Sequence, residues 1–168
     1  KLFKRKLFED IDFPYGKFSE DLFTIYKTIL KSRSITYIGF DGYFYYYRDE
    51  GSIVVSGYKK KHLEALDAVD DIAESVKGKG RFDNALSTQY INVIYDIAAR
   101  NPLLSEFRNK RIQNNLKAHR MSVLKDSNAP KRLRGFAAIS LLGNRIVLKV
   151  VVARNRRWKV QRREAKKR

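Results

Sequence analysis

The chain has 168 residues and a mass of 19.7 kDa, which suits a single domain, and its 43% of apolar residues excludes an intrinsically disordered protein. Cysteine is absent, which excludes disulfides, thiolate metal sites and thiol nucleophiles. The 36 Lys and Arg against 18 Asp and Glu give a formal charge of +18, so we expect a polyanion as the partner.

The first predicted element is a helix over residues 19–33. Ser19 can cap its beginning, and Glu20 and Asp21 suit the positive end of the helix dipole. The apolar residues recur at helical spacing and are Leu22, Ile25, Tyr26, Ile29 and Leu30. We expect this apolar face to join the core.

Residues 35–58 change to a strand-forming pattern. Three runs, 35–38, 43–47 and 53–55, are rich in β-branched and aromatic residues. Asp41-Gly42 favours a tight hairpin turn between the first two, and a second turn precedes the third. The pattern predicts a three-stranded antiparallel meander.

Tyrosines are concentrated in the middle run of this meander. Alternation would place Tyr43, Tyr45 and Tyr47 on one face and Phe44 and Tyr46 on the other. The tyrosine face could stack single-stranded bases, but strands with a buried face also favour aromatic residues. We interpret it as core or as a protein interface.

Helices are predicted next at 62–77 and 86–99, and a third from Asn101-Pro102 to about residue 124, with asparagine as cap and proline at the first helical position. The polar side of the first of these helices carries Asp67, Asp70, Asp71 and Glu74. We interpret it as a solvated acidic face. The alternatives are a divalent-metal site and a contact with basic segments of a neighbouring subunit.

The pattern after residue 125 predicts a basic hairpin and tail. Two strands, 136–142 and 145–153, would join at Gly143-Asn144, and Ile146, Leu148, Val150 and Val152 would share one face. The expected fold class is therefore α+β: an antiparallel β-meander packed with several helices, plus a basic C-terminal helix, β-hairpin and extended tail. We expect a core domain at 1–125 and the basic hairpin and tail at 126–168.

The positive charge is segregated along the chain. Residues 1–100 contain 16 basic and 15 acidic residues, whereas residues 101–168 contain 20 basic and 3 acidic ones. Such segregation costs self-repulsion, which a polyanion would remove. The candidate phosphate-contacting residues are Arg108, Lys110, Arg111, Lys117, Arg120, Lys131, Arg132, Arg134, Arg145, Lys149, Arg154, Arg156, Arg157, Lys159, Arg162 and Arg163.

Trp158 lies within this basic tail, and two interpretations of its role remain. It could stack on an exposed base, or it could anchor the tail on the domain, which we favour.

Catalytic motifs are not evident: His62 and His119 form no helical metal pair, and no nucleophile motif surrounds a serine.

We therefore predict a non-enzymatic structural protein that binds nucleic acid, RNA or DNA, through its phosphates within a large nucleoprotein assembly such as a ribonucleoprotein particle. The alternative is a structural subunit of a phage or virus particle, with its basic region facing the packaged genome. A metal-dependent nuclease is the third possibility. We expect other protein subunits as partners, no membrane partner, no cofactor and no metal.

Overall fold

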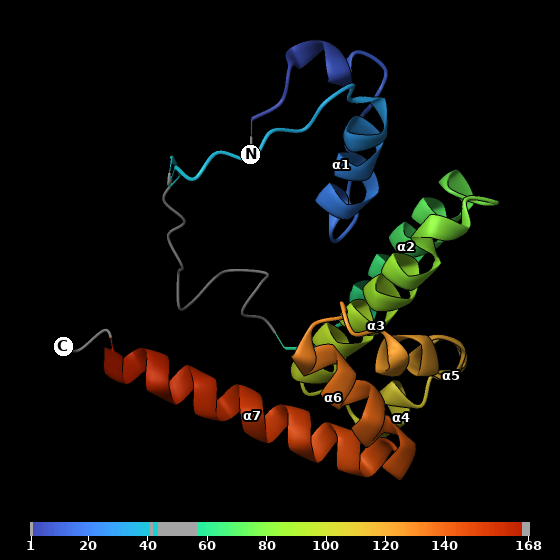
Figure 1. Cartoon of the computed structure of the whole chain (residues 1–168). Helices are drawn as coiled ribbons and strands as arrows, with labels where there is room; N and C mark the ends of the chain where they lie inside the picture. The colour runs from blue at the N-terminus through green and yellow to red at the C-terminus, as the bar shows by residue number, and fades with distance from the viewer. Residues whose placement is uncertain (1, 41, 44–56, 166–168) are drawn as a thin grey trace.

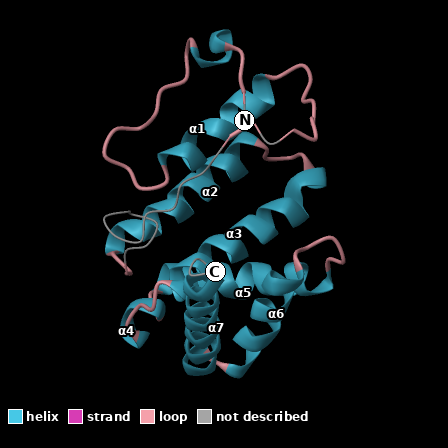
Figure 2. Ribbon diagram, turned by 90° about the vertical axis from the view of Figure 1, so that its left-hand side faces the viewer, coloured by secondary structure: helices cyan, strands magenta, loops and turns pink. Residues whose placement is uncertain are grey.

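The computed structural model describes residues 2–40, 42–43 and 57–165, with side chains up to residue 155. Within these residues all regular secondary structure is helical, and Figure 2 shows helices and loops only. The expected α+β class is therefore wrong. The helices are α1 (Glu20–Lys31), α2 (Glu64–Ser75), α3 (Asp83–Ala99), α4 (Leu104–Phe107), α5 (Lys110–Lys125), α6 (Lys131–Ile139) and α7 (Asn144–Ala165), with short 3-10 turns at η1 (Arg5–Phe8), η2 (Lys60–Leu63), η3 (Gly80–Phe82) and η4 (Ser140–Leu142).

Helix α3 is the centre of the fold. Its buried residues include Tyr90, Ile91, Val93, Ile94 and Ile97, which form one face about 160° wide. A buried face this wide needs more than one other element to cover it. Helices α2, α5, α6 and α7 all pack against α3.

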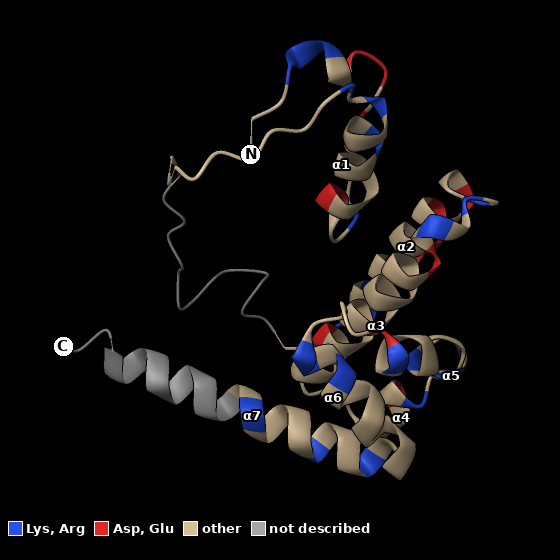
Figure 3. Ribbon diagram, in the orientation of Figure 1, with Lys and Arg blue, Asp and Glu red and all other residues tan. Residues whose placement is uncertain are grey.

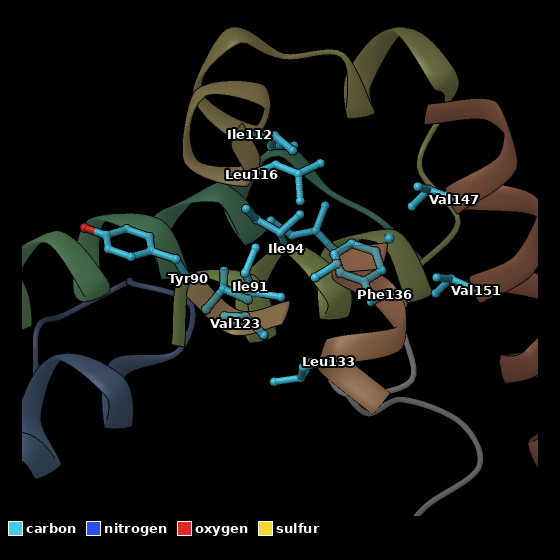
Figure 4. Packing of buried hydrophobic residues seen from close by; sticks show 14 of the residues in the cluster. Tyr90, Ile91, Ile94, Ile112, Leu116, Val123, Leu133, Phe136, Val147 and Val151 are labelled. Carbon is cyan, nitrogen blue, oxygen red and sulfur yellow. The ribbon is translucent and has the colours of Figure 1, made fainter. Parts of the chain in front are cut away.

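One hydrophobic cluster joins these helices. Figure 4 shows Ile94 of α3 next to Leu116 of α5 and Phe136 of α6, and Val147 and Val151 bring α7 into the same cluster. All five side chains are almost completely buried. Residues on both sides of position 125 therefore contribute to a common core.

The N-terminal part is attached to the bundle through α2, and Figure 2 shows α1 beside that helix. The hydroxyl of Tyr26 donates to Asp71 at 2.8 Å, and the backbone N–H of Phe18 donates to Glu64 at 3.0 Å. Thr24 and Thr28 of α1 are also buried. The N-terminal part thus docks through polar contacts and through Leu22, which packs against the core cluster.

The predicted hairpin at 136–153 is wrong: this stretch forms the end of α6, the turn η4 and the first half of α7 (Figure 1). Gly143 has φ +105° and turns the chain between η4 and α7, and Asn144 begins the helix. Among the described side chains of α7 the buried ones are Val147 and Val151, four positions apart. The run from Ile146 to Val152 is nearly all apolar, so it satisfies a period of two and a helical period equally well.

The predicted meander is not formed in its described part. Residues 35–40 and 42–43 are exposed loop, and the side chain of Tyr43 is 80% exposed. A strand needs a partner for its backbone groups, and no other described segment pairs with this one. The rest of the meander, including Tyr45 and Tyr47, lies outside the described residues.

Two predicted helix caps have a different role. Asn101 has φ +56° and its N–H donates to the carbonyl of Ala98 at 3.1 Å, so it ends α3 rather than beginning the next helix. Ser19 has φ +63° and makes no side-chain capping bond. The predicted third helix is divided into α4 and α5, and Asn109 caps α5 by accepting from the N–H of Arg111 at 2.9 Å.

Candidate nucleic-acid interface

Eight basic side chains between residues 101 and 155 are exposed and form no ion pair, hydrogen bond or ring contact in the described structure. We call them the free cations: Arg108, Lys110, Lys117, Lys125, Lys131, Arg145, Lys149 and Arg154. They lie on α5, α6 and α7 and just after α4. Figure 3 shows Lys and Arg on these helices, whereas Asp and Glu are most frequent on α2 and around α1. Sequence reasoning missed Lys125, although it belongs to the same basic helix.

The two carboxylates in this part of the chain are used locally. Glu106 Oε2 accepts the backbone N–H of Leu103 at 2.7 Å, and Asp126 Oδ1 accepts that of Asn128 at 2.9 Å. The next acidic residue along the chain is Glu164. Among the side chains described after residue 100, these carboxylates neutralise none of the free cations.

Arg111 differs from the other predicted phosphate-contacting residues. Its guanidinium forks onto two carboxylates of α2, with Nη1 on Asp67 and Nη2 on Asp70 at 2.6 Å. Asp71, one position further, is 3.3 Å from Lys27 of α1. The acidic side of α2 is thus paired within the chain itself.

A half-buried polar cluster lies beneath the Arg111 pairs. Tyr90 donates its hydroxyl to Asp70 at 2.6 Å, and its ring stacks on His119 with centroids 4.2 Å apart. His119 Nδ1 lies 3.1 Å from Ser87 Oγ. Burial raises the pKa of Tyr90, as does its bond to Asp70, and burial lowers the pKa of His119. This cluster joins α2, α3 and α5.

Three further candidate arginines contact the bundle. Arg132 donates to Asn92 Oδ1 at 2.9 Å and lies over the ring of Tyr95, and Arg120 Nη1 is 3.4 Å from the carbonyl of Ser140. Arg120 and Arg134 are half-buried, and the Nε of each has no hydrogen-bond partner. Arg120 and Arg132 therefore bond to other residues of the bundle, unlike the free cations.

The first turns of the C-terminal helices reinforce the positive potential. Helices α1, α2 and α3 begin with acidic residues, whereas α5, α6 and the described first turn of α7 have none. Instead, Lys110, Lys131 and Arg145 lie where the helix dipole is already positive. Asn144 Nδ2 donates to Gln113 Oε1 at 3.1 Å, which places the beginning of α7 beside the first turn of α5.

The remaining candidates belong to α7, but their side chains lie outside the described part; they are Arg156, Arg157, Trp158, Lys159, Arg162 and Arg163.

Among the described residues there is no group of three or more His, Asp or Glu placed to hold a metal ion. None of the described helices is both long and apolar enough to cross a membrane.

Comparisons with protein-family models, with curated proteins and with solved structures give no match for this chain.

Proposed function

We propose that the chain binds nucleic acid through the phosphate backbone, without reading base sequence. The observation that carries this proposal is the set of eight free cations, which no described carboxylate neutralises. Phosphate contact requires only that cations reach the backbone, and both Lys and Arg do so. In this proposal the protein is a structural, non-enzymatic component of a nucleoprotein assembly, either a ribonucleoprotein particle or a virus particle.

The distribution of charge supports a polyanion better than general solubility does. On α2 every aspartate of the acidic side has a partner in the same chain. By contrast, Lys110, Lys131 and Arg145 lie in the first turns of α5, α6 and α7, where the helix dipole repels a cation. A phosphate chain would be attracted by the side chains and the helix dipoles together. A chain selected only for solubility would mix both signs on these helices.

A pair of matched charge reversals tests this proposal. The variant Lys110→Glu/Lys117→Glu/Lys149→Glu changes three free cations. The control Lys17→Glu/Lys60→Glu/Lys79→Glu changes three exposed lysines before residue 100 and lowers the net charge equally. We expect at least about tenfold weaker binding for the first variant and a much smaller loss for the control.

Binding is measured by fluorescence anisotropy with single-stranded RNA and duplex DNA of equal length, after circular dichroism has shown that both variants are folded. An equal loss in the two variants would mean that only net charge matters and would refute an interface on the C-terminal helices. Comparing the two probes also shows which nucleic acid the protein prefers.

A further inference from the structure

The corner between α6 and α7 exposes a group of aliphatic side chains. Leu141 and Leu142 of η4 are 51% and 66% exposed, and Ile146 and Val150 of α7 are 43% and 41% exposed. They lie within ten residues of one another, and the last two are four positions apart on one side of α7. We call these four residues the apolar corner.

The sequence of α7 explains why these side chains cannot all be buried. Val147 and Val151 occupy the side of α7 that faces the core. Ile146 and Val150 lie about 100° around the helix from Val147 and Val151, so they stay exposed when the core side is buried. Grouped exposed aliphatic residues typically mark a binding surface.

The charged residues that neighbour the apolar corner along the chain are all positive. Arg145 and Lys149 are exposed on the same two turns of α7 as Ile146 and Val150. The described side chains from residue 127 to residue 155 include no acidic one. The partner of this surface must therefore offer apolar material and negative charge together.

We propose that the apolar corner binds the surface of an anionic lipid bilayer. Leu142, Ile146 and Val150 would enter the boundary between headgroups and acyl chains, while Arg145 and Lys149 pair with lipid phosphates. The chain would lie on the bilayer without crossing it. This inference does not depend on nucleic-acid binding, and it replaces our expectation that the protein has no membrane partner.

Other occupants fit this surface less well. Nucleic-acid phosphates would satisfy Arg145 and Lys149 but would leave the aliphatic side chains without a partner. A second copy of the chain, related by twofold symmetry, would bring Arg145 and Lys149 towards the same two cations. An anionic bilayer satisfies both parts of the surface.

The test uses the full chain and sedimentation with vesicles of phosphatidylcholine, with and without phosphatidylglycerol. The variant Leu142→Asn/Ile146→Asn changes the apolar corner, and Ile29→Asn/Leu30→Asn is a matched control because these α1 side chains are 41% and 47% exposed. We expect binding to the vesicles that contain phosphatidylglycerol, weakened at least about tenfold by the first variant and unchanged in the control.

Three results would overturn the proposal. They are no binding to either vesicle, equal binding of the corner variant and the wild type, and a corner variant whose main effect is the loss of a dimer in gel filtration. A further variant, Lys149→Glu, should weaken vesicle binding about fivefold or more, whereas Lys79→Glu should not. If Lys149→Glu leaves vesicle binding unchanged, the anionic headgroups have no part in recognition and the proposal fails.

Discussion

Arg111 carries the same charge as its neighbours Lys110 and Lys117, but its surroundings give it a different role. It pairs with Asp67 and Asp70, which precede it by 44 and 41 positions. Sequence composition identifies the cations of this helix, but it cannot tell which of them meet a carboxylate from a distant helix. The candidate interface could therefore be predicted as a group, and the internal pairing of Arg111 could not.

The same limit applies to helix caps. Asparagine is favoured both before a helix and in the left-handed position after one, so the sequence Asn101-Pro102 fits the end of α3 as well as the beginning of a new helix. The positive φ of Asn101 shows that it ends α3.

His119 should make stability depend on pH. Burial lowers its pKa from the ordinary value of 6.5, although Asp70 acts in the opposite direction. Between the lowered pKa and 6.5 the unfolded chain binds more protons, so the free energy of unfolding should fall as the pH decreases through this range. Urea unfolding between about pH 7.5 and about pH 5.5 measures the effect.

In the variant His119→Gln this pH dependence should become weaker. It should not vanish, because burial also lowers the pKa of His62. A variant with the same pH dependence as the wild type would show that His119 is not responsible for it.

At the scale of elements, amphipathic patterns predicted α1, α2 and α3 correctly, whereas the β-branched run in α7 led to the wrong prediction of a strand. In α2 acidic residues alternate with apolar ones at helical spacing, and no strand register fits that pattern. The run from Ile146 to Val152 in α7 lacks such a regular alternation of polar and apolar residues. Its helical state follows from packing on α3, which local propensity does not record.

Paired substitutions in α7 test the helix against the predicted strand. Val147 is fully buried and Ile146 is 43% exposed, whereas a strand would bury Ile146 with Leu148 and Val150. We expect Val147→Ala to cost about 2 kcal/mol of unfolding free energy in urea and Ile146→Ala less than about 0.5 kcal/mol. A larger loss for Ile146→Ala than for Val147→Ala would contradict the helical register.

At the scale of the whole molecule, one hydrophobic cluster supports two surfaces of opposite character. The acidic side of α2 is covered by Lys27 of α1 and Arg111 of α5, while α5, α6 and α7 keep their free cations. Among the described side chains, acidic residues pair with Arg111 but with none of the eight free cations. This separation is the basis for proposing an external polyanion.

The salt dependence of nucleic-acid binding tests this central claim most directly. Each neutralised phosphate of duplex DNA contributes a slope of about −0.9 to the plot of log affinity against log salt concentration, so about 6–10 contacts give a steep decrease. We predict such a decrease for the wild-type chain. The slope should become less steep by about one for each free cation removed. A wild-type slope near zero would contradict phosphate binding by the free cations.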